Sequence, residues 1–371
     1  MTCVSNRRPH VCFVAPNAYP LLAGTSDLKI VGGAELQQVM IARGLVSRGY
    51  RVSMICLNFG QADRLEIDGI VVHRAYRPTE GIPVLRFLWP RMTRIWSCLT
   101  RADADIYYQR AASVLTGFIA AHSRQHRCKS VFAVAGDPMI RFARDRWIYE
   151  YGIRNVDRII VQNETQKEAV RNRFGRESML IPNCFQPVPA GNRSPVTDVL
   201  WVSTIRQLKR PDRFLALAEA LPQYRFTMIG GPGEGEAPLF DAIRRKSERL
   251  PNVEFVGFAP YAEADAWFEQ ARLFVNTSET EGFPNTFLQS WARRVPTISF
   301  IDCGARLKRR PIGLTVESLD ELVRCVADVL ENDARRMELG TASETYVKQN
   351  HHPERVLDLY EDLFREIVGS R

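Results

Sequence analysis

The chain alternates short runs of β-branched and aromatic residues with segments of helical periodicity along nearly its whole length. Strands separated by helices are typical of a parallel sheet covered by helices, so the sequence predicts an α/β fold. The alternation stops once, in a stretch rich in Pro, Gly and Ser between Pro187 and Asp198, and then begins again. This interruption predicts a linker between two Rossmann-like halves. The expected strands span residues 11–15, 51–56, 70–75, 105–109, 130–135 and 158–162 in the first half, and 199–203, 224–230, 253–258, 273–278 and 296–301 in the second.

A length of 371 residues also fits two domains, each long enough to bury a core. We expect a first domain over residues 1–187, a linker over 188–198, a second domain over 199–352 and a final helix over 353–371. That helix has apolar residues on one stripe and charged residues opposite, which predicts that it docks on an apolar surface. The stripe comprises Val356, Leu357, Tyr360, Leu363, Phe364, Ile367 and Val368.

Composition excludes several classes of protein. Hydrophobic residues make up 45% and charged residues 25% of the chain, which are globular values and exclude disordered and repeat-dominated classes. No run approaches the roughly 18 apolar residues that a membrane span needs, and the first ten residues lack a signal peptide's apolar core, so we expect no export. The eight cysteines lie far apart without C-x-x-C spacing, which predicts reduced thiols in a cytoplasmic protein.

The net charge of +8 is compatible with nucleic acid, an anionic membrane surface or phosphorylated substrates. The cations are dispersed and no RRM, KH or zinc-finger signature is present, so we expect no nucleic-acid partner. Apolar residues between Leu85 and Leu99 form a helical stripe flanked by arginines. Such a stripe fits either an ordinary core helix or a helix that binds the inner face of an anionic membrane.

Ligands of open parallel sheets bind outside the carboxyl ends of the strands, so we expect ligand-binding residues in the loops that follow strands. The loop after the first strand ends in Gly32, Gly33, Ala34 and Glu35, where two glycines at a helix start let backbone amides approach an anion. A plain tight turn is the alternative. The spacing is not G-x-G-x-x-G, which disfavours a nicotinamide-dependent dehydrogenase.

Two loops of the second half suit a diphosphate. Arg206, Lys209 and Arg210 follow the strand 199–203 and can neutralise charge on a departing nucleotide, although a solvated basic turn is the alternative. The strand 224–230 ends in a glycine-rich turn that contains Gly231.

The densest cluster follows the strand 273–278. It carries Glu281, then Gly282, and a helix that starts near Pro284 with its positive dipole end toward the crevice. A carboxylate here can hold sugar hydroxyls while backbone amides hold phosphate. Gln289 lies eight residues after Glu281, where we expect it to reach the same ligand.

These segments resemble glycosyltransferase family 4. The resemblance rests on GGAELQQVMIARGLVSRGYRVSMIC, on IRQLKRPDRFLALAEALP, on residues 256–296 with the specific cluster EGFPNTFLQSWA, and on the final helix. It implies a GT-B fold in which two Rossmann-like domains face each other across a cleft and the final helix crosses back to the first domain. It also implies a retaining, metal-independent transfer from a sugar nucleotide, with no cofactor.

The resemblance further implies residue roles. Arg206 and Lys209 would contact the diphosphate, Glu281 would hold the donor sugar and Gln289 the ribose, while the acceptor would bind the first half. The implied donor-binding set is Gly33, Arg206, Lys209, Gly231, Glu281, Gly282, Phe283, Pro284, Asn285, Thr286 and Gln289; the implied catalytic set is Glu281, Lys209, Arg206 and Asp137; and Gly32, Gly33 and Glu35 form an acceptor or diphosphate loop.

The chain departs from the family pattern at several positions. Gln289 replaces the second glutamate of Glu-x7-Glu, Thr204 replaces the arginine that usually precedes the diphosphate lysine, and Arg294 stands where a small residue is expected. Asp137 is a stand-in for a missing first-domain histidine. These departures keep open an alternative, a catalytically impaired sugar-nucleotide scaffold or sensor.

Two motifs could suggest a metal, and we expect neither to bind one. Asp103 and Asp105 form a D-x-D, but it precedes its strand and so lies at the amino end of the sheet. His122 and His126 lie four residues apart on an expected helix, where we expect both to be solvated.

The sequence therefore predicts an enzyme that moves a hexose from a UDP- or GDP-linked sugar to a hydroxyl of a saccharide or lipid-linked saccharide in surface polysaccharide biosynthesis. We expect it in the cytoplasm, with peripheral association with the cell membrane as an open option.

Overall fold

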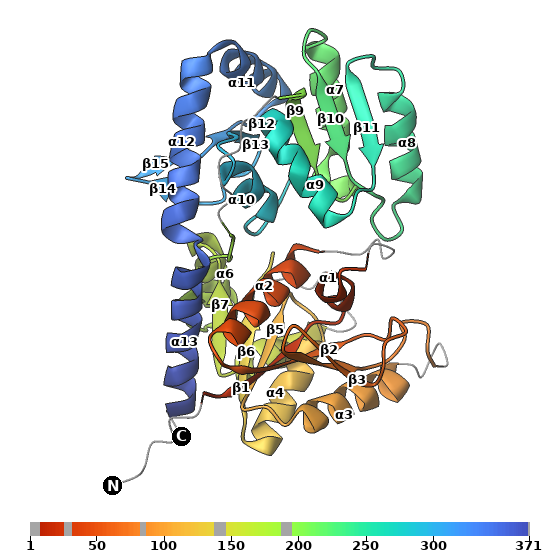
Figure 1. The fold of residues 1–371 in the computed structure, drawn as a ribbon, viewed down its shortest axis with the longest axis vertical. Coiled ribbons are helices and arrows are strands. Elements are labelled where there is room, and N and C mark those ends of the chain that lie inside the picture. The colour runs from red at the N-terminus through yellow and green to blue at the C-terminus, as the bar shows by residue number, and fades with distance from the viewer. Residues whose placement is uncertain (1–7, 26–31, 82–86, 137–145, 187–194, 370–371) are drawn as a thin grey trace. The chain divides into compact units, whose positions relative to one another are not determined.

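The computed structural model describes residues 8–25, 32–81, 87–136, 146–186 and 195–369. The chain divides into two compact units (Figure 1): unit 1 comprises Met1–Cys184 and Pro353–Arg371, and unit 2 comprises Phe185–His352. Most of the expected linker, residues 187–194, lies outside the described residues. Both units are α/β, as the alternation of strands and helices predicts.

Unit 1 contains an eight-stranded sheet in the order β3-β4-β2-β1-β5-β6-β7-β8. All neighbouring strands are parallel except the edge pair β3 and β4. The strands are β1 (His10–Val14), β2 (Arg51–Cys56), β3 (Arg64–Ile67), β4 (Ile70–Arg74), β5 (Ile106–Arg110), β6 (Lys129–Ala133), β7 (Arg158–Val161) and β8 (Met179–Leu180).

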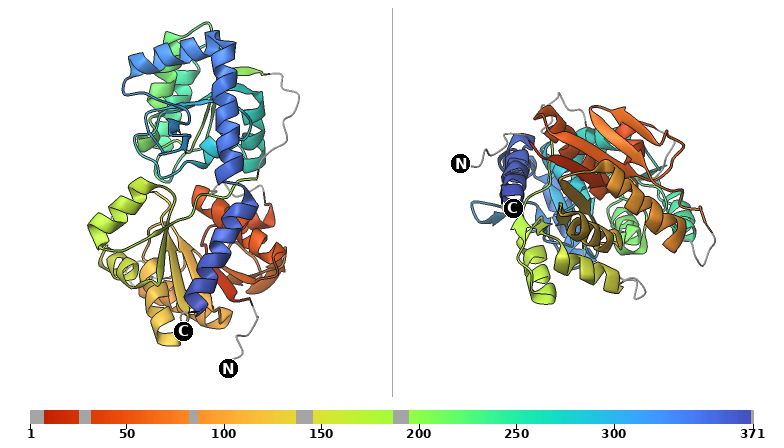
Figure 2. Two further views of the ribbon diagram at one scale, coloured as in Figure 1. Left: turned by 90° about the vertical axis from the view of Figure 1, so that its left-hand side faces the viewer. Right: turned by 90° about the horizontal axis from the view of Figure 1, so that it is seen from below.

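Helices cover both faces of this sheet. Its helical segments are α1 (Tyr19–Ala23), α2 (Gly33–Ser47), η1 (Phe87–Met92), α3 (Thr93–Ala102), α4 (Leu115–His126), α5 (Arg146–Asn155), α6 (Glu164–Phe174) and α13 (Pro353–Gly369). Helices α2 and α13 lie side by side on one face (Figures 1 and 2), where they share a core with alternate residues of β1, β5 and β6. Helices α3, α4, α5 and α6 pack on the opposite face.

Helix α13 is held to unit 1 by its apolar stripe. Six stripe residues, Val356, Leu357, Tyr360, Leu363, Phe364 and Ile367, are buried in the core that contains α2. The Tyr360 hydroxyl also lies 3.1 Å from the Tyr108 hydroxyl of β5. On the polar side, Arg48, the residue that caps the C-terminus of α2, forms ion pairs with Glu354, Asp358 and Glu361.

Unit 2 has a six-stranded parallel sheet in the order β11-β10-β9-β12-β13-β16 and a separate two-stranded hairpin. The strands are β9 (Thr197–Val202), β10 (Phe226–Ile229), β11 (Val253–Gly257), β12 (Ala271–Asn276), β13 (Thr297–Ser299) and β16 (Leu314–Thr315), with β14 (Arg306–Leu307) and β15 (Arg310–Pro311) in the hairpin. The helical segments are η3 (Gln207–Lys209), α7 (Pro211–Ala220), α8 (Ala237–Ser247), α9 (Tyr261–Trp267), η4 (Phe268–Gln270), α10 (Asn285–Trp291), α11 (Leu319–Glu331) and α12 (Asp333–Asn350). Helices α7, α8 and α11 cover one face, and α9, α10 and α12 cover the other.

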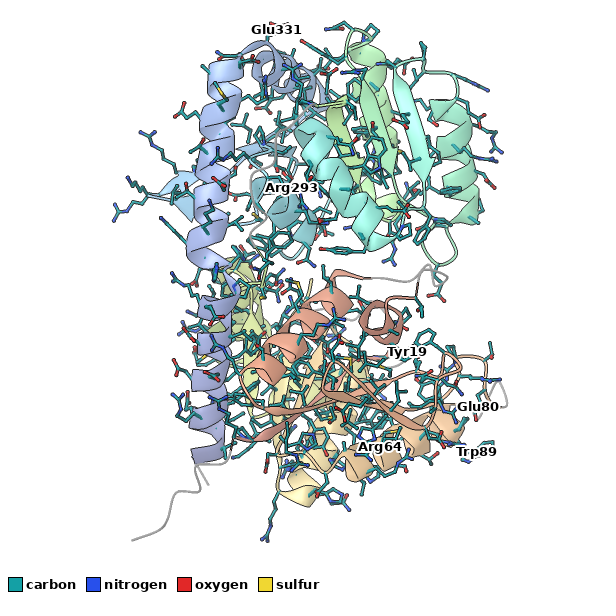
Figure 3. All side chains as sticks on the ribbon, in the orientation of Figure 1. Tyr19, Arg64, Glu80, Trp89, Arg293 and Glu331 are labelled. Carbon is teal, nitrogen blue, oxygen red and sulfur yellow. The ribbon has the colours of Figure 1, made fainter. Side chains whose placement is uncertain are left out.

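The stripe expected between Leu85 and Leu99 does not form one helix. Trp89 has extended backbone angles because the residue before a proline is excluded from the helical region, and α3 begins only at Thr93. Beyond the kink, Ile95 and Leu99 are buried in the core of unit 1, whereas the Trp89 side chain is 63% exposed and points outward (Figure 3). The stripe therefore combines a core helix with a solvent-exposed tryptophan.

The expectation that both histidines of α4 are solvated is wrong for His122. Its side chain is buried and makes edge contacts with Trp96 and Tyr107, at ring-centroid distances of 5.1 and 5.2 Å. Burial and, to a lesser extent, the neighbouring His126 lower the pKa of His122 to about 4. His122 is thus a core residue, on the same helix as the buried Ile119 and Ala120.

Asp103 and Asp105 lie at the amino end of β5, as their order in the sequence predicts. Asp105 accepts a hydrogen bond from the backbone N–H of His10 at 2.9 Å, which links the starts of β5 and β1. Among the described residues, no group of three or more His, Cys, Asp or Glu side chains is placed to hold a metal ion. No helix in the same part of the chain has the length and apolar character needed to cross a bilayer.

Candidate active site

The candidate site of unit 2 lies where its strand order reverses. From β9 the chain proceeds to β10 and β11 on one side, then returns to β12 on the other side of β9. In parallel sheets such a reversal opens a crevice at the carboxyl ends of the two central strands. The loops that follow β9 and β12 border this crevice, and they contain Lys209 and Glu281.

Hydrogen bonds tie these two loops together. The Thr277 hydroxyl donates to the Lys209 carbonyl at 2.7 Å and accepts from the indole N–H of Trp201 at 2.9 Å. The backbone N–H of Glu279 donates to the carbonyl of Leu208 at 2.9 Å. The relative position of the loops is therefore set within unit 2.

Lys209 and Glu281 form an ion pair across the two loops. The Ser278 hydroxyl donates to the same carboxylate oxygen, Oε1 of Glu281, at 2.8 Å. Both charged side chains are about one-fifth exposed, so each retains access to solvent. The structure thus brings together two residues that were predicted separately, 72 positions apart in the sequence.

A second set of ion pairs involves Arg210, the residue that follows Lys209. Arg210 donates to Glu279 at 2.9 Å and to Asp212 at 2.7 Å, and its backbone is in the left-handed region with φ of 47°. Hydrogen bonds to Asp212 and Glu279 raise the pKa of Arg210. Of the three basic residues in this loop, Arg210 is therefore paired with one carboxylate that follows it in the chain, Asp212, and with one from the loop after β12, Glu279.

The glycine-rich loop after β10 packs against Arg206. Ile205 and Gly231 share a backbone hydrogen bond of 2.9 Å, and a Cβ at Gly233 would lie 2.6 Å from Cγ of Arg206. A Cβ at Gly230 would collide with the carbonyl of Ser203. Glycine is thus required at Gly230 for close approach of the two loops, and the exposed Arg206 side chain lies over the turn that contains Gly231.

The segment from Gly282 to Thr286 enters helix α10, whose N-cap is Pro284. Phe283 is buried and packs on Trp291 with ring centroids 6.2 Å apart. Its side chain therefore anchors the loop in the core of unit 2. Only backbone groups of Phe283 remain for the donor role that the sequence suggested.

Gln289 has a partner that the sequence did not reveal. Its side chain is buried, and Nε2 donates to Oδ1 of Asp265 on α9 at 2.7 Å. Arg293, one turn further along the chain, donates to Oδ2 of Asp265 at 2.6 Å. No motif marks Asp265 or Arg293; the only signal is the spacing of four residues between Gln289 and Arg293.

The arginine at position 294 is accommodated outside the site. Its backbone is left-handed with φ of 55°, the conformation that explains why a small residue was expected there. Its Nε donates to Glu344 of α12 at 2.8 Å. This departure from the family pattern therefore changes the packing between α10 and α12 and does not touch Lys209 or Glu281.

The remaining predicted residues belong to unit 1 or are not described. Gly32 precedes α2 as its N-cap, and the Glu35 side chain folds back so that a Cβ at Gly32 would collide with its carboxylate. Gly33 is the first residue of α2. Asp137 lies outside the described residues.

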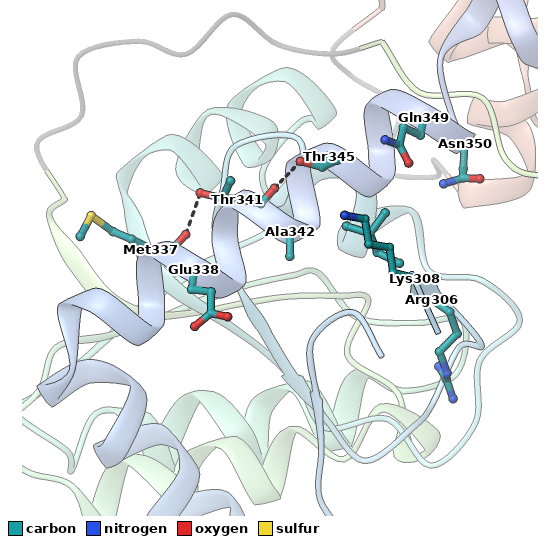
Figure 4. Close-up of a pocket in the computed structure, with 10 residues that line it drawn as sticks. Arg306, Lys308, Met337, Glu338, Thr341, Ala342, Thr345, Gln349 and Asn350 are labelled. Atoms are coloured by element: carbon teal, nitrogen blue, oxygen red, sulfur yellow. Dashed lines mark hydrogen bonds between the residues drawn. The ribbon is translucent and has the colours of Figure 1, made fainter. Parts of the chain in front are cut away.

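A cavity of about 770 Å³ opens elsewhere on unit 2, between the β14–β15 hairpin and helix α12 (Figure 4). Its lining is mixed and includes Arg306, Lys308, Met337 and Glu338. None of the residues predicted for the donor site lines it.

Comparisons with known proteins agree with this architecture. Residues 31–187 match the family model Glycosyltransferase Family 4, and residues 197–332 match Glycosyl transferases group 1. Among curated proteins, the chain is 23% identical to a phosphatidylinositol N-acetylglucosaminyltransferase component of Arabidopsis thaliana over 72% of this chain and 64% of that protein. It is 24% identical to the O-antigen biosynthesis glycosyltransferase WbnH of Escherichia coli over 52% of this chain and 56% of that protein. The chain thus spans less than two thirds of the length of either relative.

Solved structures share the fold. The sucrose-phosphate synthase of Thermosynechococcus elongatus superimposes with a TM-score of 0.77 and 16% identity, covering 98% of this chain and 100% of that one. Anabaena HepE in complex with UDP-glucose gives a TM-score of 0.72 at 16% identity, with 98% and 100% covered. At such identities the likeness establishes the fold and not the substrates.

Proposed function

The chain belongs to the glycosyltransferases, with a family 4 first half and a group 1 second half in a GT-B fold, and we propose that it transfers a hexose from a UDP- or GDP-linked sugar to an acceptor hydroxyl with retention of configuration. The observation that carries the proposal is the Lys209–Glu281 ion pair at the strand-order reversal of unit 2.

The two members of the pair suit the two parts of a sugar nucleotide. The Lys209 ammonium stabilises the diphosphate as negative charge develops on it, and Arg206 adds a second exposed cation nearby. Glu281 accepts hydrogen bonds from sugar hydroxyls and so orients the sugar. Donor binding would place an anion beside Lys209, which then shares its charge between the diphosphate and Glu281.

The proposed reaction needs a stabilised leaving group more than a strong base. The bond between the anomeric carbon and the diphosphate oxygen breaks, and the acceptor oxygen bonds to the same face of that carbon. The acceptor proton passes to an oxygen of the departing nucleoside diphosphate. We propose that protein cations, rather than a divalent metal, neutralise this leaving group.

We propose a saccharide or lipid-linked saccharide as acceptor and surface polysaccharide as product. The relatives named for O-antigen biosynthesis and for phosphatidylinositol N-acetylglucosaminyl transfer support this class. The exposed Trp89 beside the basic helix α3 supports peripheral contact with an anionic membrane from the cytoplasmic side.

Thermal-shift and calorimetric measurements with a panel of UDP- and GDP-sugars in EDTA test the donor and metal proposals together. Specific binding raises the melting temperature by mass action. Binding that is lost in EDTA and restored by Mg²⁺ or Mn²⁺ contradicts metal independence.

A second function, a non-catalytic sugar-nucleotide scaffold, has one observation in its favour. Gln289 is neutral and already hydrogen-bonded to Asp265, which leaves less of its side chain for a ligand. Nucleotide binding without turnover across a broad acceptor panel would favour the scaffold.

A further inference from the structure

Unit 1 has a strand-order reversal of its own. The chain leaves β1 through α2 to β2 and β4 on one side, while β5 begins the other half of the sheet directly beside β1. The carboxyl ends of β1 and β5 therefore border the position where a parallel sheet binds ligands. Arg110 is the last residue of β5.

The buried Arg110 guanidinium has no counter-charge among the residues that the structure describes. The residue is 6% exposed, its Nη2 donates to Oδ1 of Asn183 at 2.7 Å, and its Nε is buried without a hydrogen-bond partner. No carboxylate among the described residues forms an ion pair with it. A buried cation is costly unless an anion compensates it, and the side-chain partner of Arg110 that the structure describes is a neutral amide.

A second unpartnered polar side chain lies on the same face of the sheet. Arg110 follows Tyr108 by two residues, and Gln162 follows Ile160 by two, so both side chains lie on the α2 and α13 face that contains Tyr108 and Ile160. Gln162 directly follows β7, which is separated from β5 by β6. It is 4% exposed, and neither its Nε2 nor its Oε1 has a partner within the described part of the chain. Of the described residues, two buried donors without acceptors thus lie at the carboxyl ends of strands on one sheet face.

The surroundings of Arg110 are fixed in advance. Gln37 of α2 donates to the Cys184 carbonyl at 2.8 Å and accepts from the Cys184 amide at 2.7 Å. These bonds hold the segment that carries Asn183, the partner of Arg110. The guanidinium is therefore oriented before any ligand arrives.

We propose that Arg110, supported by Asn183 and Gln162, is an anion-binding site that receives a carboxylate or phosphate group of the acceptor. An incoming oxyanion accepts from the Arg110 Nε–H and supplies the negative charge that the described residues of unit 1 do not provide at this point. The assignment of this anion to the acceptor molecule rests on the proposed glycosyltransferase function. The anion site itself rests only on the geometry of unit 1.

The test uses the full-length chain and three small probes: inorganic phosphate, D-glucuronate and, as the neutral control, D-glucose. Calorimetry should detect phosphate or glucuronate and not glucose, and whichever anion binds more tightly identifies the group. Arg110→Gln should weaken that anion at least tenfold, about 1.4 kcal/mol. The matched control is Arg51→Gln, an exposed arginine at the opposite end of the same sheet, which should leave anion affinity unchanged.

UDP affinity, a property assigned to unit 2, separates this proposal from the proposed function. An unchanged melting profile of Arg110→Gln shows that unit 1 is intact, and unchanged UDP affinity then supports an acceptor-side anion. An equal loss of UDP affinity assigns the anion to the donor diphosphate and overturns the acceptor assignment. A wild-type chain that binds UDP but neither anion overturns the site while leaving the proposed function intact.

Gln162→Leu keeps the proposal testable even where Arg110→Gln does not fold. Replacing an unpartnered buried amide by a slightly smaller apolar group should raise the melting temperature. If Gln162 donates to the anion, the same change should weaken the bound anion about threefold. Higher stability with unchanged anion affinity contradicts a role for Gln162.

Discussion

The two sheets place opposite kinds of charge arrangement at equivalent positions. At the reversal of unit 2, Lys209 meets Glu281 and Arg210 meets Glu279, so each of these cations has a carboxylate within the unit. At the reversal of unit 1, Arg110 is buried against a neutral amide. An ion pair such as Lys209–Glu281 is stable without a ligand, and a ligand can replace one of its members. A buried cation such as Arg110, which has no carboxylate partner among the described residues, has its charge neutralised only when an anionic ligand binds.

Under the proposed function, this difference would separate two roles, donor binding and acceptor selection. Unit 2 would hold the donor by exchanging a carboxylate for a diphosphate at Lys209, with Glu281 released toward sugar hydroxyls. Unit 1 would select the acceptor by requiring an anion. Four substitutions or conditions test the contrast, from the largest expected effect to the smallest.

Glu281→Gln should have the largest effect on turnover. The substitution keeps the shape but removes the charge that orients the sugar, so we expect turnover to fall about a hundredfold, equivalent to roughly 2.7 kcal/mol. Affinity for free UDP should barely change, because UDP carries no hexose. Steady-state kinetics with the cognate donor measures the first quantity and calorimetry the second; unchanged turnover contradicts the role.

Lys209→Ala should weaken nucleoside diphosphate binding by about 2 kcal/mol, or roughly thirtyfold, because it removes a charge-assisted contact and leaves Glu281 to repel the diphosphate. Nucleoside binding should change less. Arg213→Ala, at a cation of α7 whose guanidinium packs on the Phe300 ring, is the control. If the control and Lys209→Ala bind UDP equally well, Lys209 is an ordinary surface cation.

Unit 1 should also lose stability in mild acid. The pKa of His122 is lowered to about 4, mainly by burial, so its stabilising contribution is complete above its unfolded value near 6.5 and is lost as the pH falls toward 4. Between pH 7 and pH 5 we expect a loss of about 1 to 2 kcal/mol in the free energy of unfolding. Denaturant titrations at both pH values should give a smaller loss for His122→Leu; part of the loss should persist, because burial also lowers the pKa of His73 to about 4. An identical loss in the variant contradicts this assignment.

The smallest effect concerns Gln289 and its partner. Gln289→Glu restores the commoner family residue but places a second carboxylate against Asp265, so we expect UDP affinity to fall by about 1 kcal/mol, roughly fivefold. Adding Asp265→Asn should return affinity to within about twofold of wild type. If Gln289→Glu alone binds UDP normally, Asp265 does not govern this part of the site.

The sequence predicted the sheets and the loops better than the contacts between loops. Buried parallel strands are continuous apolar runs, and the α13 stripe required an apolar partner, so both could be recognised locally. The burial of His122 depends on Trp96 and Tyr107 from neighbouring elements, and no local pattern reveals it. The antiparallel edge strand β3 and the β14–β15 hairpin are too short for periodicity to detect.

The same distinction applies to the candidate site: the positions of its residues could be predicted from the sequence, but the contacts between them could not. Lys209 and Glu281 were each predicted from a loop after a strand, but their ion pair follows from the order β10-β9-β12, which sequence alone did not establish. The Gln289–Asp265 bond and the isolation of Arg110 are tertiary facts of the same kind. Local sequence predicts where charged residues lie; the fold decides which of them are paired.

Amide hydrogen exchange of the full chain with and without UDP, in EDTA, tests the central claim most directly. The account predicts protection of residues 203–210 and 277–286, which border the strand-order reversal of unit 2. It predicts no change in residues 306–311 and 337–350, which contribute to the cavity beside the hairpin. Protection confined to those latter residues, or binding of UDP without protection of either loop, would contradict it.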